Sequence, residues 1–254
     1  MNKFRKWLPM AFRDLLRPLK TPIESIICWF IRLRSKDKVI SGPFKGMAFR
    51  YPQQEYAMLL GTWELELART WNLILAKDYP LMVDIGAAEG YYAVGMAFRK
   101  PKSRIVAFEM EDRVRQDLTT MRHLNDAELE IRAKCELEDL AAFGQELEDA
   151  FILVDIEGFE TVLLDPEKIP SLLKSWILVE LHDFYSEGCS ALLRSRFEAS
   201  HNIELIKGKE RSINDLPQAI GILNKLFSNR RLVPFMDEGR PHPMSWYFMV
   251  PKSG

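Results

Sequence analysis

Short apolar runs alternate with amphipathic stretches along most of the chain. The runs "LMVDI", "RIVAFE", "FILVDI" and "WILVEL" have the length and the β-branched and aromatic content of buried strands. Stretches between them, such as 111–124, repeat their apolar residues at helical spacing. Strands that are apolar on both faces and separated by helices are typical of a parallel sheet covered on both sides. The pattern therefore predicts an α/β protein with a Rossmann-like, doubly wound, mostly parallel sheet.

The same pattern divides the chain into three parts. Residues 1–38 form a basic helical arm, 39–76 a hairpin and helices that lead into the core, and 77–254 the main domain. The hairpin is expected in "KVISGPFKGMAFRY", where glycine and proline mark turns. Within the main domain, 209–242 is a polar, helix-containing insertion, and we expect the last strand, "SWYFMV", to be antiparallel.

Charge is concentrated in the arm. Residues 1–38 hold ten Lys/Arg and three Asp/Glu, a net of +7, although the whole chain has a net charge of −1. The apolar stretches of the arm are shorter than the ~20 residues of a membrane span. Two interpretations stay open: peripheral contact of residues 1–38 with an anionic membrane surface, or a basic helical arm packed on the acidic body.

Cysteine and histidine usage gives little sign of metal or disulfides. Cys28, Cys135 and Cys189 are too few and too scattered for a disulfide framework, and no C-x-x-C pair or histidine spacing indicates a metal site. The simpler interpretation is a protein of a reducing, cytoplasmic compartment without a metal.

Every predicted strand between 81 and 181 except "LEIRA" ends in an acid. The end positions carry Asp84, Glu109, Asp155 with Glu157, and Glu180 followed by His182. The carboxyl ends of parallel strands form the edge at which doubly wound sheets bind ligands. Carboxylates gathered there repel one another, and a cationic or hydroxyl-rich ligand would offset that cost.

The loop after the first strand, "VDIGAAEGYY", indicates which ligand. A dinucleotide fingerprint G-x-G-x-x-G starting at Gly86 would end at the bulky Tyr91, which is a poor match. The pattern D-x-G-x-G-x-G fits Asp84, Gly86, Ala88 and Gly90 with one Gly→Ala change. An acid there would repel a pyrophosphate but suits the ammonium group of S-adenosylmethionine.

A second acid supports this interpretation. Glu109 ends the next strand, 25 residues after Asp84. In the related dinucleotide geometry, an acid at that strand end hydrogen-bonds the ribose hydroxyls.

Longer strings then resemble one family, the FkbM-like group of class I S-adenosylmethionine-dependent methyltransferases. "LLGTWELEL", "VDIGAAEGYYAVG" and "AFEM" resemble its lead-in, cofactor loop and ribose strand, and "ILVDIEGFE" with "ILVELHD" are the most specific strings. The similarity spans roughly 55–205. It implies a class I methyltransferase fold in which 77–254 is the catalytic domain and 209–242 lies on the acceptor side. It also implies O-methylation of a hydroxyl on a sugar, lipid or other small metabolite.

The residues assigned to the cofactor lie at the ends of the first two predicted strands and in the loop after the first, and one more lies at the end of the fourth strand. They are Asp84, Gly86, Ala88, Glu89, Gly90, Tyr92, Glu109, Met110 and Asp155.

A hydroxyl acceptor also requires a base. His182 is the first candidate, with Glu180 on the same side of the strand to hold its ring and a pKa near the ordinary ~6.5. Asp155 is the alternative and Glu157 the third candidate. No D/N-P-P-Y string follows the fourth strand, where the chain reads "DIEG", so we expect no nucleic-acid partner.

Two other functions stay open on sequence alone. One is a non-catalytic scaffold that binds S-adenosylmethionine, and the other is a nicotinamide-dependent oxidoreductase on the same sheet. The second is disfavoured by Asp84 and Tyr91.

Overall fold

The computed structural model describes residues 21–50, 56–240 and 244–252. The chain forms two compact units. The helical unit consists of Met1–Leu65 and Lys209–Pro243, and the sheet unit of Glu66–Gly208 and Met244–Gly254. The segment 209–243 therefore belongs with the start of the chain, although more than 140 residues separate the two in sequence.

The sheet unit is built on seven strands in the order β3-β2-β1-β4-β5-β7-β6. The strands β1 to β5 are parallel, and β7 runs antiparallel between β5 and β6. This confirms the predicted doubly wound sheet with an antiparallel last strand. The strands are β1 Leu81–Ile85, β2 Arg104–Phe108, β3 Glu130–Arg132, β4 Phe151–Val154, β5 Trp176–Leu181, β6 His201–Lys207 and β7 Ser245–Pro251.

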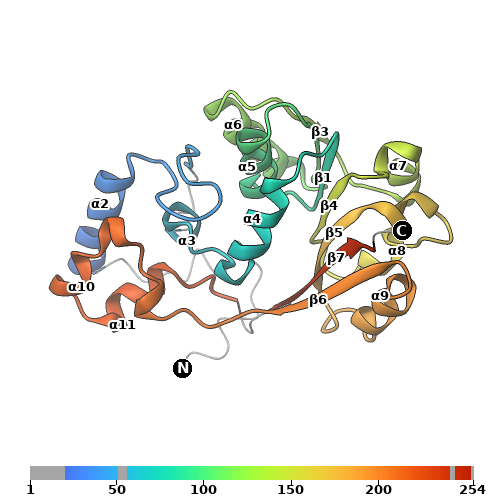
Figure 1. Cartoon of the computed structure of the whole chain (residues 1–254). Helices are drawn as coiled ribbons and strands as arrows, with labels where there is room; N and C mark the ends of the chain where they lie inside the picture. Colours follow the sequence, from blue (N-terminus) through green and yellow to red (C-terminus); the bar gives the residue numbers. More distant parts are fainter. Residues whose placement is uncertain (1–20, 51–55, 241–243, 253–254) are drawn as a thin grey trace. The chain divides into compact units, whose positions relative to one another are not determined.

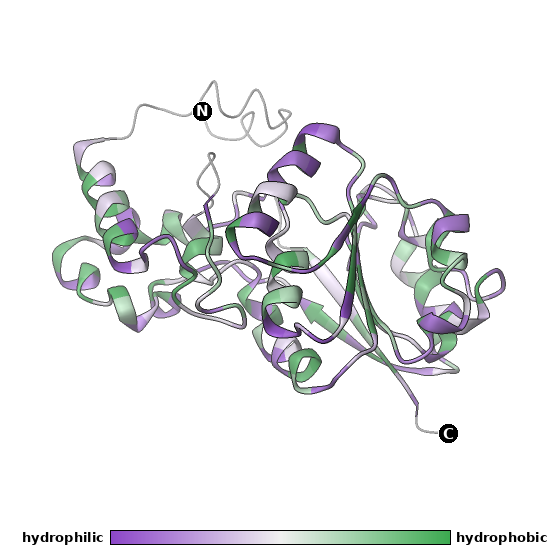
Figure 2. Cartoon of the chain, turned by 90° about the horizontal axis from the view of Figure 1, so that it is seen from above, coloured by the Kyte–Doolittle hydropathy of each residue, from purple (hydrophilic) through white to green (hydrophobic). Residues whose placement is uncertain are grey.

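Helices cover both faces of this sheet (Figure 1). One face carries α4 Ala68–Ala76, α5 Tyr91–Arg99 and α6 Asp112–Leu124, and the other carries α7 Leu137–Ala141, α8 Glu160–Leu163 and α9 Cys189–Phe197. Short 3₁₀ helices complete the connections: η2 Leu65–Leu67, η3 Gly144–Leu147 and η4 Pro170–Lys174. The central strands β1, β4 and β5 are buried on both sides, and hydrophobic residues are frequent along the strands (Figure 2).

Strand register decides which side chains share a face. Asp84 pairs with Leu153, and Leu153 pairs with Leu178. Their neighbours Val83, Ile152 and Val179 belong to the core under α7, α8 and α9. Because side chains alternate along a strand, Asp84 lies on the opposite face, toward α4 and α5, and so does Glu180, two residues beyond Leu178. Two acids thus share one face near the carboxyl edge.

The helical unit contains α2 Pro22–Ser35 and α3 Tyr56–Leu60, followed after the sheet segment by η5 Ile213–Asp215, η6 Gln218–Ile220, α10 Leu223–Leu226, α11 Asn229–Leu232 and η7 Val233–Phe235. The helix α2 begins with a capping box between Thr21 and Glu24. Its end is joined to the 209–243 segment by Arg34, whose guanidinium donates to the Ala219 carbonyl.

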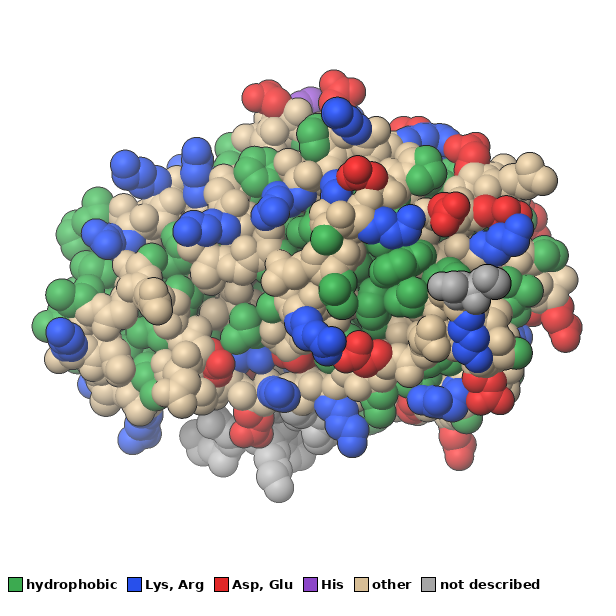
Figure 3. Space-filling model, in the orientation of Figure 1, with side chains coloured by type: hydrophobic (Ala, Val, Ile, Leu, Met, Phe, Trp, Pro, Cys, Tyr) green, Lys and Arg blue, Asp and Glu red, His purple; other side chains and the backbone are tan. Residues whose placement is uncertain are grey.

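The predicted arm is described only in its second half, because residues 1–20 lie outside the described residues. One face of α2 buries Ile27 and Ile31, whereas Trp29 on the other face is 62% exposed. Over α2 and α10, apolar side chains border Lys and Arg side chains (Figure 3). No helix in the described ranges combines the length and the apolarity needed to cross a bilayer. Peripheral membrane contact stays a prediction.

The predicted hairpin is a compact loop closed by one bridge. Lys38 and Ala48 form an isolated antiparallel pair, and Val39 and Met47 are joined by a backbone hydrogen bond. Residues 51–55, at its far end, lie outside the described residues. The turn was predicted correctly, but the segment around it does not form two strands in the described part.

Two strand-end segments meet where β1 and β4 finish. The Asp155 amide donates to the Ile85 carbonyl at 2.9 Å. Gly86, with φ +90°, lies so close that a Cβ there would be 1.9 Å from the Asp155 carbonyl oxygen. Only glycine combines this backbone angle with so close an approach.

We therefore expect Gly86→Ala to destabilise the sheet unit through both strain and a backbone clash. Gly144→Ala is the matched control, because Gly144 has φ +54° and a Cβ added there would meet nothing within 4 Å. The control should cost roughly 1–2 kcal/mol, the penalty for an L-residue in the left-handed region, and Gly86→Ala clearly more. The free energy of unfolding in urea measures both. Equal losses would contradict the close approach.

Candidate active site

The first half of the candidate site is the acid near the end of β1. Asp84 is 2% exposed, and its Oδ2 has no hydrogen-bond partner within the described part of the chain. Burial, followed by the nearby charge of Glu109, raises the pKa of Asp84 to about 8, against a hydrogen bond from the Ala93 amide. A buried carboxyl oxygen without a partner is costly in a structural role, so it is a candidate ligand-binding atom.

The loop after β1 is held by β2. The amides of Gly86 and Ala87 both donate to the Phe108 carbonyl. Ala88 has φ 46°, the left-handed conformation that a glycine would adopt freely, and its amide donates to Glu109 Oε2 at 3.0 Å. The Glu111 amide donates to Glu109 Oε1 at 2.8 Å. The carboxylate of Glu109 is therefore fixed beside the loop, at the predicted strand end.

The other predicted cofactor residues differ in their surroundings. Gly90 brings α5 against α6, since a Cβ there would lie 2.3 Å from Leu118 Cδ1. Tyr92 stacks on Trp71, with ring centroids 4.9 Å apart. Glu89 is buried, and Met110 is 71% exposed at the end of β2. Their roles toward a cofactor stay predictions.

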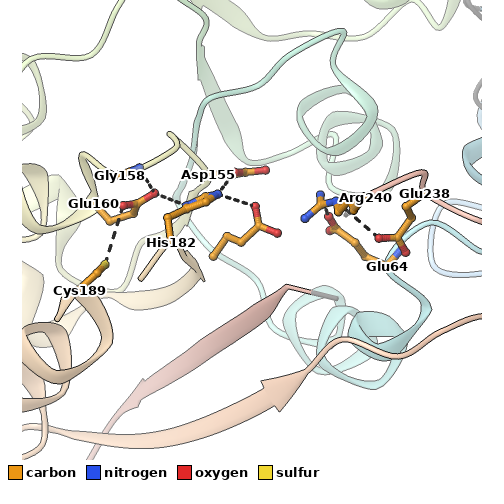
Figure 4. A network of polar contacts seen from close by, with 9 residues as sticks. Glu64, Asp155, Gly158, Glu160, His182, Cys189, Glu238 and Arg240 are labelled. Atoms are coloured by element: carbon orange, nitrogen blue, oxygen red, sulfur yellow. Dashed lines mark hydrogen bonds and ion pairs between the residues drawn. The ribbon is translucent and has the colours of Figure 1, made fainter. Parts of the chain in front are cut away.

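The second half of the candidate site surrounds His182, which follows β5 and is 3% exposed (Figure 4). Its Nδ1 lies 2.6 Å from Glu160 Oε1. Its Nε2 lies 3.1 Å from Glu180 Oε2 and 3.6 Å from Asp155 Oδ1. Three carboxylates from two segments thus face one imidazole, and both ring nitrogens are occupied.

This arrangement corrects the expectation of an ordinary histidine pKa. Burial alone would lower the pKa of His182, but the hydrogen bonds to Glu160 and Glu180 and the charges of Glu180 and Asp155 outweigh it and raise the pKa to about 10. The ring is therefore an imidazolium near neutral pH in this arrangement. An imidazolium has no lone pair with which to accept a proton.

Sequence reasoning favours a structural role for Glu160 and misses its contact with His182. Glu160 is 0% exposed, and it also accepts a hydrogen bond from the Gly158 amide at 3.1 Å. Although burial raises the pKa of a carboxyl group, the bonds from His182 and Gly158 hold the pKa of Glu160 below its usual value. The sequence feature that could have indicated this contact is the string "DIEGFE", in which Glu160 follows Asp155 by five residues.

The two remaining base candidates differ in position. The side chain of Asp155 is 31% exposed, so it is the member of the His182 group that reaches solvent. Glu157 is exposed, has φ 52°, and is absent from the described carboxylates within 4 Å of His182. The structure therefore groups Asp155, Glu160 and Glu180 with His182 and leaves Glu157 outside the group.

Exposed aromatic side chains lie beside this group. Phe159, Phe184 and Tyr185 are 58–61% exposed. The Tyr185 ring is 5.9 Å from the His182 ring, and a Cβ on Gly158 would touch Tyr185 at 3.2 Å. The loops that follow β4 and β5 are thus in contact, and they present apolar surface next to the polar group.

A separate cavity of about 790 Å³ lies between α6 and β3. Its lining includes Arg115, Arg122 and Arg132. None of the candidate residues named above lines it, so we assign the site from the strand-end geometry.

Comparisons with known proteins identify the fold class. No protein-family model matches the chain, and no curated protein sequence matches it. Solved structures do match. An rRNA methylase from Streptococcus thermophilus has a TM-score of 0.50 at 11% identity, covering 74% of this chain and 97% of its own. The O-methyltransferase TomG from Streptomyces achromogenes, in complex with S-adenosylmethionine, has a TM-score of 0.45 at 12% identity, covering 98% and 99%.

A third match is an O-methyltransferase from Bacillus cereus in complex with S-adenosylhomocysteine, with a TM-score of 0.45 at 14% identity, covering 95% of this chain and 96% of that chain. At such identities the likeness establishes the fold alone. Together with the strand order, the likeness to the Streptococcus thermophilus structure shows that the chain has the class I methyltransferase fold.

The buried carboxyl of Asp84 gives a pH-dependent test of this half of the site. Its folded-state pKa lies above the unfolded value, so the folded protein keeps a proton that the unfolded chain loses. Stability should therefore fall as pH rises from about 4 to about 8, by at most about 1.4 kcal/mol per pH unit. Asp84→Asn, which cannot ionise, should lack this loss.

The measurement is urea unfolding of both proteins without ligand between pH 4 and pH 9. The stability difference should grow in favour of the variant up to about pH 8 and then level off. A difference that is constant with pH would mean that Asp84 is hydrated or otherwise paired in solution.

Proposed function

We propose that this protein transfers the methyl group of S-adenosylmethionine to a hydroxyl of a small molecule such as a sugar or a lipid. The observation that carries the proposal is the group of Asp155, Glu180 and His182 at the carboxyl edge of β4 and β5. It lies next to β1, which carries Asp84 and is followed by Gly86. Donor and acceptor must meet at such an edge for an in-line transfer.

The residues around β1 and β2 fit the proposed cofactor. The unpartnered Oδ2 of Asp84 suits an ammonium group, and ionisation of this carboxyl would follow from binding a cation. Gly86 and Ala88 leave the loop without bulky side chains, and the carboxylate of Glu109 is held beside it. Bound there, S-adenosylmethionine would supply an electrophilic methyl group on a sulfonium.

The chain's own contribution is to position the acceptor and remove its proton. Because both nitrogens of His182 are engaged by carboxylates, the geometry favours Asp155 as the proton acceptor in place of His182. Asp155 is the partly exposed member of the group and so is the one a substrate hydroxyl can reach. His182 and Glu180 then act as positioning residues that fix the orientation of Asp155.

The FkbM-like resemblance gains support from this grouping. Its two most specific strings, "DIEGFE" and "ELHD", contribute Asp155 with Glu160 and Glu180 with His182. All four residues belong to one network of contacts. Side chains needed only for folding would not have to converge on one imidazole, so we assign the chain to an FkbM-like methyltransferase as part of this proposal.

The two alternatives are weaker on specific grounds. Tyr91 is buried in the position that the last glycine of a dinucleotide fingerprint would occupy, which counts against a nicotinamide dinucleotide. A non-catalytic scaffold would have no use for a buried group of charges at the acceptor edge, since such groups are costly to bury.

Cofactor binding is the first test. Isothermal titration with S-adenosylmethionine should give saturable binding, and thermal shift should respond to it but not to a nicotinamide dinucleotide. Asp84→Asn and Glu109→Gln should each weaken binding by about 10- to 100-fold, equivalent to the roughly 1.5–3 kcal/mol of a hydrogen bond to a charged group. Glu128→Gln, an exposed carboxylate elsewhere, is the control. Unchanged affinity in both site variants would refute the cofactor placement.

Methyl transfer is the second test, followed with tritiated methyl groups and a panel of monosaccharides and hydroxylated lipids. Asp155→Asn should cut the single-turnover rate, measured with saturating S-adenosylmethionine, by roughly 10²–10⁴. Glu187→Gln, an exposed neighbour in the loop after β5, should retain the rate. Full activity of Asp155→Asn, with loss in Glu157→Gln, would move the base outside the His182 group.

A further inference from the structure

We propose that Asp155, Glu180 and His182 form a binding site for one divalent transition-metal cation. Binding of the cation does not depend on the proposed function, but its role in methyl transfer rests on it. Each of the three residues offers one ligand atom, and these atoms all lie within 4.8 Å of one another. Of the groups in the described part of the chain, this one combines imidazole and carboxylate ligands at such spacing.

The distances suit a shared cation. His182 Nε2 is 3.1 Å from Glu180 Oε2 and 3.6 Å from Asp155 Oδ1. Ligand atoms bound at ~2.0–2.2 Å to one metal ion are separated by roughly 3–4 Å. His182 Nε2 is therefore already at a ligand-like separation from an oxygen of each carboxylate, and the ligand atoms of the three residues lie within 4.8 Å of one another.

The environment of Glu160 favours a metal over a simple ion-pair group. Glu160 Oε1 faces His182 Nδ1 at 2.6 Å and is itself fixed by the Gly158 amide at 3.1 Å (Figure 4). A carboxylate can only accept, so Nδ1 carries the hydrogen and Nε2 is directed at Asp155 and Glu180. A carboxylate that holds the far nitrogen of a ligating histidine is the usual outer support of metal sites.

Charge and burial point the same way. Glu160 is 0% exposed, Glu180 2% and His182 3%. Three carboxylates face this one imidazole in a poorly solvated place, so negative charge is concentrated there. A dication in place of a proton on Nε2 would reduce this negative charge, and buried charges are tolerated where they coordinate metals.

The ligand set selects the kind of cation. Carboxylate oxygens suit Mg²⁺ and Mn²⁺, whereas an imidazole nitrogen favours Mn²⁺ or Zn²⁺ over Mg²⁺ and Ca²⁺. With three protein ligands, the cation would keep open coordination positions on the side where Asp155 reaches solvent. An acceptor hydroxyl held there would become more acidic.

The transfer step then balances as follows. The hydroxyl proton passes to the carboxylate oxygen of Asp155 that does not ligate the cation. The hydroxyl oxygen forms its bond to the methyl carbon while the carbon–sulfur bond breaks, and that electron pair stays on sulfur. The cation's part is to hold the acceptor oxygen in line with that bond.

The test is a Mn²⁺ titration of chelator-treated full-length protein, followed by calorimetry and by loss of the free-ion signal in electron paramagnetic resonance. We expect one saturable site per chain. Asp155→Asn and Glu180→Gln should each raise the dissociation constant at least 100-fold, and Glu160→Gln by about 10–100-fold, the usual effect of losing an outer support. Glu187→Gln should bind as the unmodified protein does.

Circular dichroism and thermal unfolding show whether each variant is folded. If Glu180→Gln does not fold, the test rests on Asp155→Asn, because Asp155 is partly exposed and its substitution disturbs the fold less. The absence of saturable binding of Mn²⁺ and of Zn²⁺, or binding that Asp155→Asn leaves unchanged, would overturn the inference. Affinity for S-adenosylmethionine is measured on the same samples. If cofactor binding and methyl transfer persist after the chelator treatment, the cation site is refuted and the proposed function stands. If the protein binds the cation but not S-adenosylmethionine, the proposed function is refuted and the cation site stands.

Discussion

The contact between Glu160 and His182 is the constraint on which the candidate site depends. Glu160 begins α8, after the loop that follows β4, and His182 follows β5, so this pair ties two strand-end segments together. Both side chains are almost completely buried. Removing one partner of such a pair leaves an uncompensated buried charge, at a cost of about 3–5 kcal/mol. The loop that carries Asp155 is therefore held by electrostatics as much as by packing, which gives a short, glycine-containing segment a defined position.

The cofactor half of the site has the opposite character. Asp84 is buried without a complete set of partners, and Glu109 holds a loop through backbone amides only. An unsatisfied buried carboxyl stores a cost that a cationic ligand removes. The two halves thus differ in character: the His182 group is fixed in advance by its own contacts, whereas Asp84 offers an unsatisfied oxygen to a ligand.

Much of this could be predicted from the sequence, because strands buried on both faces leave a plain apolar signature. The strands β1, β2, β4, β5 and β7 were located within one or two residues, and with them the edge that collects Asp84, Asp155 and Glu180. The pKa of His182 was not predictable, since it depends on Glu160, which reaches the ring from a helix start and not from a strand end. Nor was the joining of residues 21–65 with 209–240, because contacts between distant segments carry no local pattern.

The position of β7 has a consequence for the order in which the protein folds. Its residues come from the last ten of the sequence, yet it lies between β5 and β6, and Trp246 is the register partner of Glu180. During synthesis β5 and β6 emerge long before the strand that separates them. Until Ser245–Pro251 has inserted, both present open edges, and such edges are prone to wrong pairing. Assembly of the candidate site is thus a late event of folding, and fraying of this one strand would loosen Glu180 before it disturbed the β1 loop.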